Sequence, residues 1–437
     1  MKIYSENKNY KLYQGSMLDM LDNIKENSID SIVTDPPYEL NFMGKGWDNA
    51  GISFNKATWS KCYEVLKPGG YLLAFGGSRT FHRIAVAIED AGFEIRDTIM
   101  WLYGSGFPKS QNISKILDKK FGKERPIIGY TDNAGIAKNE KPDSTGSHIW
   151  SGNITSDEPI TDLAKQWHGW GTALKPSFEP IIVARKPFKG SLVDNVIKYG
   201  VGGINIDECR VPFNGDKWKA QKSGSSSRAF QSEKLTTADG KCEANDNGRF
   251  PANTILTYDE TDFDEVCGGF PYTHPAGNKN ESNITKGNSM FGIGGIGKRN
   301  PKIPGDNGGS ASRYFYCAKA SKKDRDEGLD KFEEVNGESY LFRQDGSLDG
   351  QIPARKNTHP TVKPTTLMQY LVRLVTPNGG IVLDPFNGSG STGKAVMYEN
   401  KEHNKNYKYI GIELTDEYLP IAKARIEYVD NEIKKEI

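Results

Sequence analysis

Near its N-terminus the chain reads Ile29-Asp30-Ser31-Ile32-Val33-Thr34-Asp35-Pro36-Pro37-Tyr38. The apolar run at 29–34 predicts a buried strand that ends in a carboxylate. Proline fixes φ, lacks a backbone donor and keeps the residue before it out of the helical region. The sequence therefore predicts a rigid, non-helical turn whose free backbone groups are mostly carbonyl acceptors.

A carboxylate and a carbonyl beside an aromatic ring suit a planar base that carries an exocyclic amino group. Asp35 and the Pro36 carbonyl can accept the two amino hydrogens, and the Tyr38 ring can stack on the base. The plainer interpretation is a strand terminator, because Asp-Pro is a common turn. The C-terminal part of the chain bears on this choice.

A second apolar run, Ile381-Val382-Leu383-Asp384, leads through Pro385-Phe386-Asn387-Gly388-Ser389-Gly390-Ser391-Thr392-Gly393 into a predicted helix. Three cofactor loops fit these glycines: a dinucleotide fingerprint, a phosphate-binding P-loop and a loop for S-adenosylmethionine. The P-loop lacks its magnesium-binding hydroxyl, since Ala395 follows Lys394. The carboxylate of Asp384 is unfavourable beside a pyrophosphate, but it suits the cationic amino-acid end of S-adenosylmethionine.

A third apolar run, Tyr409-Ile410-Gly411-Ile412, ends at Glu413. An acid at the end of the strand that follows a glycine loop can bind both ribose hydroxyls of an adenosine cofactor. Glu413 therefore supports an adenosine ligand without choosing between cofactors. A simple capping role for this acid stays open.

Together, Asp35-Pro36-Pro37-Tyr38 and Asp384-Pro385-Phe386-Asn387-Gly388-Ser389-Gly390 resemble the catalytic and cofactor motifs of amino-group DNA methyltransferases. The order of the motifs, with the catalytic one first, is similar to the β class, a circular permutation of the usual arrangement. Further stretches resemble bacterial and prophage members of this family, and they are residues 12–38, 170–180, 312–319 and 359–364.

The resemblance implies an α/β fold, namely a Rossmann-like S-adenosylmethionine-dependent methyltransferase fold. It should be circularly permuted, with a mostly parallel twisted sheet, an antiparallel strand pair and an inserted target-recognition region. The implied catalytic residues are Asp35, Pro36, Pro37 and Tyr38. The implied cofactor-side residues are Asp384, Pro385, Phe386, Gly388, Gly390, Glu413, Lys363 and Thr361.

One position departs from the family pattern. The glycine at the place of Gly15 is usually followed by an acid that contacts the cofactor adenine, whereas Ser16 follows here. We expect either Ser16, through its hydroxyl, or Asp19, from the following helix, to make this contact.

The activity implied by the resemblance is methyl transfer from S-adenosylmethionine to N6 of a flipped-out adenine in double-stranded DNA. An acid as the first motif residue is usual for the N6-adenine enzymes of this family, so adenine is favoured over N4 of cytosine. Methylation of RNA or of a protein amide, and an inactive DNA-binding protein, are the other hypotheses. A separate restriction endonuclease and a homodimer are partners that the sequence leaves open.

Composition narrows the class of protein. The 437 residues allow two or three domains, and 26% charged with 36% hydrophobic residues indicate a soluble globular chain. The sequence shows neither a membrane span nor a signal peptide, so we expect a cytoplasmic, bacterial or phage-encoded enzyme without a membrane partner. Five scattered cysteines argue against a disulfide framework. We expect no metal, and a zinc site from Cys242, Cys267 and His274 is disfavoured because no Cys-x-x-Cys occurs.

The net charge of +1 is low for a DNA-binding protein, but a locally basic cleft would suffice. Candidate DNA contacts lie in the polar middle of the chain, where a solvated surface charge is the alternative for each. They are Arg228, Arg249, Lys298, Arg299 and Arg313.

Periodicity predicts strands at 71–75, 93–103 and 180–185, the last two antiparallel, and helices at 53–66 and 79–91. Strands that alternate with helices indicate a parallel sheet, whose sites lie at the carboxyl ends of its strands. Asp35 and Asp384 should therefore share one site. The predicted division is a first catalytic part (1–105), an insertion (106–170), a catalytic strand (171–190), a target-recognition region (191–355) and a second catalytic part (356–437).

Overall fold

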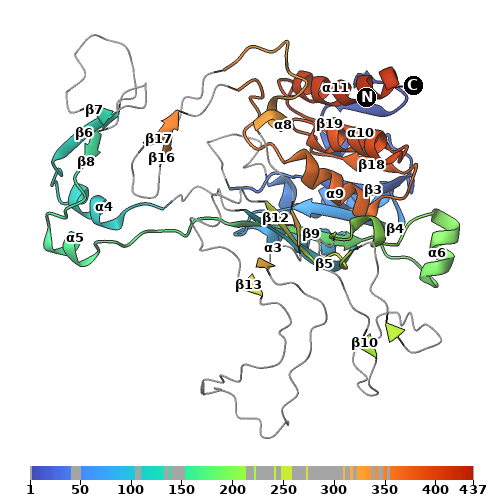
Figure 1. The fold of residues 1–437 in the computed structure, drawn as a ribbon, viewed down its shortest axis with the longest axis horizontal. Coiled ribbons are helices and arrows are strands. Elements are labelled where there is room, and N and C mark those ends of the chain that lie inside the picture. The colour runs from blue at the N-terminus through green and yellow to red at the C-terminus, as the bar shows by residue number, and fades with distance from the viewer. Residues whose placement is uncertain are drawn as a thin grey trace, which may run out of the picture.

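The computed structural model describes most of the chain, namely residues 2–40, 51–103, 110–131, 137–138, 153–212, 221–222, 241–242, 248–257, 272–273, 309–310, 315–317, 322–335, 340–342, 348–351 and 355–436. Ten strands of these residues form one sheet (Figure 1). Their order is β1 (Lys2–Glu6), β2 (Tyr10–Gln14), β19 (Lys408–Glu413), β18 (Ile381–Asp384), β3 (Ile29–Thr34), β4 (Leu66–Phe75), β9 (Phe178–Arg185), β5 (Glu94–Tyr103), β12 (Thr254–Thr257) and β15 (Tyr316–Cys317).

The sheet is mostly parallel, as predicted. Strands β2, β19, β18, β3 and β4 are parallel neighbours, so the two C-terminal strands fill the space between β2 and β3. Strand β9 is antiparallel to both β4 and β5, which confirms the predicted antiparallel pair and adds a second one. The first two strands, β1 and β2, form a further antiparallel pair that the sequence did not predict.

The last two strands of the sheet, on the side of β5, come from the middle of the chain. Strands β12 and β15 extend the sheet in parallel beyond β5. Both lie within 191–355, the range predicted as the target-recognition region, so this range also contributes to the central sheet. The division of the chain into domains remains a prediction.

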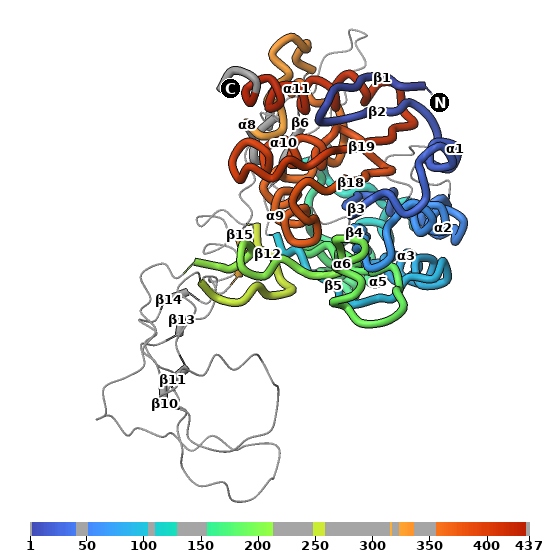
Figure 2. The backbone as a smooth tube through the Cα atoms, turned by 90° about the vertical axis from the view of Figure 1, so that its right-hand side faces the viewer, coloured from blue at the N-terminus to red at the C-terminus, as the bar shows by residue number. Residues whose placement is uncertain are grey.

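Helices cover both faces of the sheet (Figure 2). One face carries α1 (Met17–Leu21), α2 (Lys56–Val65) and α3 (Phe81–Asp90), and the other carries α9 (Thr365–Val375), α10 (Ser391–His403) and α11 (Leu419–Glu436). Each face buries its own apolar cluster, one around Trp59 and Ile84 and the other around Tyr370 and Ile426. This is the predicted α/β architecture.

The predicted N-terminal elements are present with shifted boundaries. The helix predicted at 53–66 begins as a 3-10 turn, η3 (Ile52–Phe54), and becomes α-helical at Lys56, where the Asn55 side chain accepts from the Ala57 N–H. Strand β4 starts at Leu66, earlier than predicted. Gly92, the predicted stop after α3, has a φ of 105°, which favours glycine.

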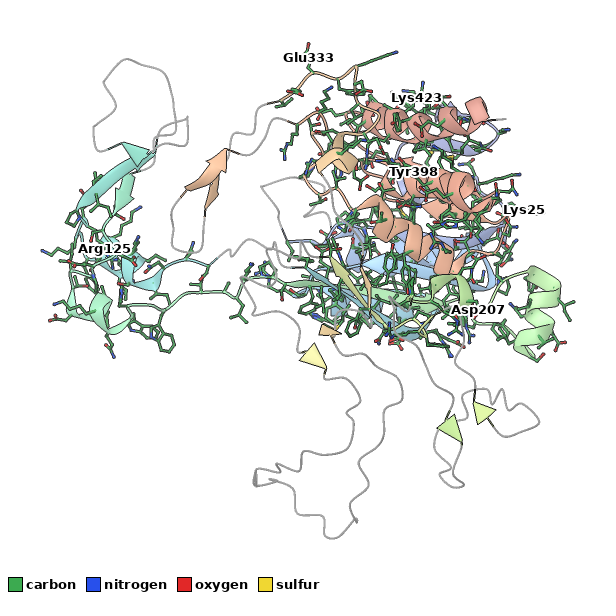
Figure 3. The ribbon with its side chains drawn as sticks, in the orientation of Figure 1. Lys25, Arg125, Asp207, Glu333, Tyr398 and Lys423 are labelled. Carbon is green, nitrogen blue, oxygen red and sulfur yellow. The ribbon has the colours of Figure 1, made fainter. Side chains whose placement is uncertain are left out.

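The predicted insertion contains α4 (Ile113–Lys120), β6 (Ile127–Thr131), β7 (Ala137–Lys138), β8 (Asn153–Thr155) and α5 (Asp162–Gln166). It has its own buried ion pair, because Arg125 Nε lies 2.8 Å from Asp118 Oδ2 and both side chains are buried. Figure 3 shows Arg125 well away from the central sheet.

Shorter elements complete the described part of the chain. They are α6 (Leu192–Tyr199), η4 (Asp207–Cys209), α8 (Lys322–Asp326), β10 (Gln221–Lys222), β11 (Lys241–Cys242), β13 (Tyr272–Thr273), β14 (Gly309–Ser310), β16 (Tyr340–Phe342) and β17 (Leu348–Gln351). None of the helices described in the structure is both long and apolar enough to cross a lipid bilayer.

A buried ion network connects α8 to α10. Helix α10 follows the loop of residues 385–390, which we call the glycine loop. The fully buried Lys394 of α10 donates to Asp324 Oδ1 at 2.7 Å and lies 2.9 Å from Glu327 Oε2. Arg425 of α11, also fully buried, donates to the Ser389 carbonyl at 2.9 Å. The side of the glycine loop that faces away from the cavity is thus held by two fully buried cations, Lys394 and Arg425.

We predict that Lys394→Met lowers the free energy of unfolding by about 3–5 kcal/mol, because it leaves the carboxylates of Asp324 and Glu327 without their buried cation. The matched control is Lys401→Met on the same helix, whose partly exposed pair with Glu432 should contribute at most about 1 kcal/mol. Urea unfolding followed by circular dichroism measures both. Equal losses in the two variants would contradict a special role for the buried network.

Candidate active site

The carboxyl ends of β2, β19, β18, β3 and β4 meet at one edge of the sheet, where they surround a cavity of about 930 Å³. Both sequence motifs line it, with Asp35, Pro36, Pro37 and Tyr38 on one side and Asp384 to Ser389 on the other. The structure therefore brings together two segments that lie far apart in the sequence. It places them at the edge where the parallel sheet predicts a shared site.

Asp35 keeps one carboxylate oxygen without a partner. Its Oδ2 accepts from Lys363 Nζ at 2.7 Å, whereas its buried Oδ1 accepts no hydrogen bond from the described residues. Burial raises the pKa of Asp35, and the Lys363 ammonium opposes that rise. A buried acceptor without a donor is costly unless a ligand supplies one.

Two backbone carbonyls of this loop accept side-chain hydrogen bonds. The Pro37 carbonyl accepts from the Ser53 hydroxyl at 2.6 Å, and the Tyr38 carbonyl accepts from the Thr80 hydroxyl at 2.9 Å. Among the described residues, none donates to the Pro36 carbonyl. Asp35 Oδ1 and this carbonyl thus form the pair of acceptors that the sequence predicts.

Lys363 lies at a different place from the one predicted. We expected it on the cofactor side, but its buried ammonium sits between Asp35 and Glu179, 3.4 Å from Glu179 Oε2. It also lies 5.3 Å from the centre of the Tyr38 ring. Burial alone would lower the pKa of Lys363, but the two carboxylates raise it above its ordinary value, so the side chain is a stable cation.

Glu179 is a site residue that the sequence analysis missed. It stands near the start of β9, and its Oε2 accepts from the Tyr38 hydroxyl at 2.6 Å. Because β9 is antiparallel to β4, its first residues lie at the edge where the parallel strands end. The predicted antiparallel strand could therefore have pointed to the acid at its beginning.

Asp384 is buried beneath the glycine loop and is fully supplied with donors. Its Oδ1 accepts from the Thr34 hydroxyl at 2.7 Å and from the Phe386 N–H at 3.1 Å, and its Oδ2 accepts from the Thr392 hydroxyl at 2.7 Å. Burial raises the pKa of Asp384 to about 6 despite these bonds. The carboxylate is held in one orientation at the end of β18.

Glu413 supports the glycine loop from the next strand. Its Oε2 accepts from the Gly388 N–H at 2.6 Å, and its Oε1 accepts from the Thr415 N–H at 2.8 Å. Gly388 has a φ of 51°, and a Cβ there would lie 2.9 Å from His359 Nε2. Gly390 serves packing instead, because a Cβ there would lie 2.9 Å from the Ala422 Cα of α11.

The P-loop hypothesis does not fit this geometry. The lysine of that motif would be Lys394, whose ammonium is bonded to Asp324 behind the loop. Its side chain is fully buried there and therefore cannot reach a phosphate in the cavity.

The other predicted cofactor-side residues take different positions. Ser16 lines the cavity and caps α1, its hydroxyl accepting from the Leu18 N–H at 3.3 Å. Asp19 is exposed on α1 and lies outside the set of residues that line the cavity. Thr361, Pro385 and Phe386 line the cavity too.

His359 is a second missed residue of the cavity wall. Its ring packs edge-on against Tyr418, with 4.5 Å between the centroids, and its Nδ1 lies 3.1 Å from the Thr361 carbonyl. Burial lowers the pKa of His359 to about 3, so the imidazole is neutral at pH 7. The histidine belongs to the 359–364 stretch of the sequence analysis, but only the fold places it beside Gly388.

Most of the predicted DNA contacts, namely Arg228, Lys298, Arg299 and Arg313, lie outside the described residues. Arg249 lies away from the cavity, where its backbone pairs with Val211 and its side chain donates to the Pro212 carbonyl. The exposed cations that line the cavity are instead Arg79 and Lys175. No group of metal-binding side chains occurs in the described parts of the chain, and the disfavoured zinc set falls largely outside them.

Known proteins with similar sequences are methyltransferases. The chain is 28% identical over 152 residues to the type II methyltransferase M.HindIII of Haemophilus influenzae, which covers 34% of this chain and 37% of that protein. It is 25% identical over 233 residues to the type II methyltransferase M2.LlaDCHI of Lactococcus lactis subsp. cremoris, which covers 46% of this chain and 82% of that protein. The chain thus spans little more than a third of M.HindIII.

Among solved structures, the PvuII DNA methyltransferase (cytosine-N4-specific) aligns with 99% of this chain and 96% of its own, at a TM-score of 0.40 and 12% identity. The model of the N6_N4_Mtase family, described as DNA methylase, matches residues 29–424. Since this match covers most of the sequence, the chain belongs to the N6/N4 DNA methylase family.

Proposed function

We propose that the protein transfers a methyl group from S-adenosylmethionine to N6 of a flipped-out adenine in double-stranded DNA. The observation that carries this proposal is the unpartnered, buried Oδ1 of Asp35 in a cavity shared with the glycine loop and Glu413. An exocyclic amino group is a donor that would satisfy it. The family membership supports the same chemistry.

The cavity suits S-adenosylmethionine and a base together. Its volume of about 930 Å³ is near the upper end of small-molecule sites, which span roughly 300–1,000 Å³. Acids stand where a cationic amino-acid end and a ribose need them, and His359 adds no positive charge. The residues that would hold the cofactor are Asp384, Pro385, Phe386, Gly388, Glu413, Thr361 and Ser16. When bound, the cofactor supplies an electrophilic methyl group.

The chain's own residues hold the base and take up its proton. A base must leave the duplex stack for its amino group to be reached, which costs a few kcal/mol, and stacking on Tyr38 offsets about 1–3 kcal/mol. Asp35 Oδ1 and the Pro36 carbonyl accept the two amino hydrogens and so direct the nitrogen lone pair at the methyl carbon. With S-adenosylmethionine bound, its methyl group would pass to this nitrogen, and Asp35 would take up the surplus proton of the amino group. The raised pKa of Asp35 suits this role as a base.

Adenine is the proposed target because the first motif residue is an acid, Asp35. The names of the relatives, type II methyltransferases, support duplex DNA as the partner and a bacterial or phage setting, where DNA lies in the cytoplasm. A separate restriction endonuclease and a second copy of the chain are the further partners of this proposal, which co-purification and sedimentation would detect.

The decisive test supplies radiolabelled S-adenosylmethionine and unmethylated DNA to the protein, followed by nucleoside digestion and mass analysis. We expect N6-methyladenine. N4-methylcytosine would keep the mechanism but replace the target base. Label in RNA or protein with none in DNA would overturn the DNA assignment, and cofactor binding without any transfer would indicate an inactive DNA-binding protein.

We predict that Asp35→Ala lowers the rate of methyl transfer by about 10²–10⁴-fold or more, because the amino group loses both its acceptor and its base. Cofactor affinity, measured by calorimetry, should change little. Asp19→Ala, which removes an exposed acid outside the cavity, is the control and should keep full turnover. Unchanged turnover in Asp35→Ala would refute the catalytic role.

We predict that Asp384→Asn weakens cofactor binding by about 10-fold or more, since a charged hydrogen-bonding group is worth about 1.5–3 kcal/mol. Burial raises the pKa of Asp384 to about 6, so the carboxyl gains its negative charge as the pH rises through that value. Affinity of the wild type for the cationic cofactor should therefore increase between about pH 5 and about pH 7. Calorimetry across this range checks both points, and an unchanged affinity and pH profile in Asp384→Asn would count against the assignment.

We predict that Arg79 and Lys175 bind DNA phosphates beside the flipped nucleotide. Each change to alanine should weaken DNA binding on all sequences and reduce the slope of log affinity against log salt by about 1. Arg79→Lys should keep the slope, because it keeps the charge. Lys25→Ala is the control, since Lys25 precedes β3 and thus lies at the opposite edge of the sheet. Fluorescence anisotropy over a salt series measures these slopes, and wild-type slopes in both alanine variants would exclude phosphate contacts.

A further inference from the structure

Glu179 has no part in the mechanism described so far, although it touches two residues of the catalytic side. Its Oε2 accepts the Tyr38 hydroxyl at 2.6 Å and lies 3.4 Å from Lys363 Nζ. Lys363 in turn donates to Asp35 Oδ2 at 2.7 Å. We call Asp35, Tyr38, Glu179 and Lys363 the Asp35 cluster.

The donors of the cluster are arranged so that one acceptor stays without a partner. A tyrosine hydroxyl carries one proton, and that of Tyr38 is directed at Glu179. The ammonium of Lys363 is shared between Asp35 Oδ2 and Glu179. Asp35 Oδ1 is left without a donor, although the negative charge of Asp35 is close enough to Tyr38 to help raise the pKa of its hydroxyl.

We propose that Glu179 is a positioning residue that keeps Asp35 Oδ1 open to the amino group of the substrate. It does so by holding the Tyr38 hydroxyl, a neighbouring donor that could otherwise occupy this oxygen. The same bond fixes the Tyr38 ring in the orientation on which the base stacks. This inference rests on the proposed function.

Without Glu179, the Tyr38 hydroxyl should donate to Asp35 Oδ1 and so block the acceptor. In Glu179→Ala the Tyr38 hydroxyl loses its partner and turns to Asp35, where it competes with the amino group. A hydrogen bond to a charged acceptor is worth about 1.5–3 kcal/mol, so we expect a fall in kcat of about 10- to 100-fold. Tyr38→Phe removes the competing hydroxyl but keeps the ring, so the double variant should recover most of this loss. Adding Tyr38→Phe should therefore restore activity to the Glu179→Ala variant.

The charge of Glu179 acts separately from its hydrogen bond. Asp35 faces Lys363, Glu179 and Tyr38. Asp384, at the end of β18, is close enough to Asp35 to feel its charge, and Tyr103 of β5 interacts with Glu179. The negative charge of Glu179 raises the pKa of Asp35, so its removal lowers that pKa. Asp35 must be ionised to take up the proton of the amino group, and therefore the acid limb of the kcat/KM profile should move to lower pH in Glu179→Gln. The glutamine carbonyl can still accept from Tyr38, so kcat should fall less than in Glu179→Ala.

The experiment measures kcat, KM and the pH profile of DNA methylation for the wild type, Glu179→Ala, Glu179→Gln, Tyr38→Phe and the Glu179→Ala/Tyr38→Phe pair. Cofactor affinity by calorimetry shows that each variant is folded and binds. Glu333→Ala, which removes an exposed acid that does not line the cavity (Figure 3), is the control and should match the wild type.

A fall in Glu179→Ala, its recovery in the double variant and the acid shift in Glu179→Gln would support the inference. If the double variant were no faster than Glu179→Ala, or if the acid limb stayed in place, the inference would be overturned. If Glu179→Ala did not fold, the pH profile of Glu179→Gln would decide alone. A wild type that does not methylate DNA would instead overturn the proposed function, so the two failures are distinguishable.

Discussion

The site depends on one geometric constraint, the meeting of strand ends at a single edge of the sheet. Each of the acids Asp35, Asp384 and Glu413 follows or ends a parallel strand, and Glu179 stands near the start of the antiparallel strand β9. These four carboxylates therefore gather without any long loop to position them. Their spacing follows from the strand order, which places β18 and β19 between β2 and β3.

Burying several carboxylates together costs free energy unless hydrogen-bond donors lie beside them. Asp384 has two threonine hydroxyls and a backbone N–H, and Glu413 has two backbone N–H groups. Asp35 differs, because one of its oxygens has no donor among the described residues. Asp35 is thus distinguished from Asp384 and Glu413, whose carboxylate oxygens all accept hydrogen bonds.

The sequence was informative where a function rests on a local pattern. Apolar runs ending in Asp35, Asp384 and Glu413 predicted three strands, which the structure shows to be neighbours, and the glycines predicted the turn between β18 and α10. It failed where the function of a side chain depends on a distant partner. The family resemblance implied a cofactor-side position for Lys363, whereas its ammonium lies between Asp35 and Glu179, more than 180 residues away. Strand β12 escaped notice because four residues give too little periodicity.

The strand order also constrains how the protein is made. Strands β2 and β3 leave the ribosome early, but the strands that fill the gap between them follow about 350 residues later. At roughly 5–20 residues per second this delay lasts roughly 20–70 seconds. For that time two inner strand edges lack their partners and invite wrong pairing. The nascent chain should therefore be prone to aggregation during this interval, and the cavity should be incomplete until the last strands dock.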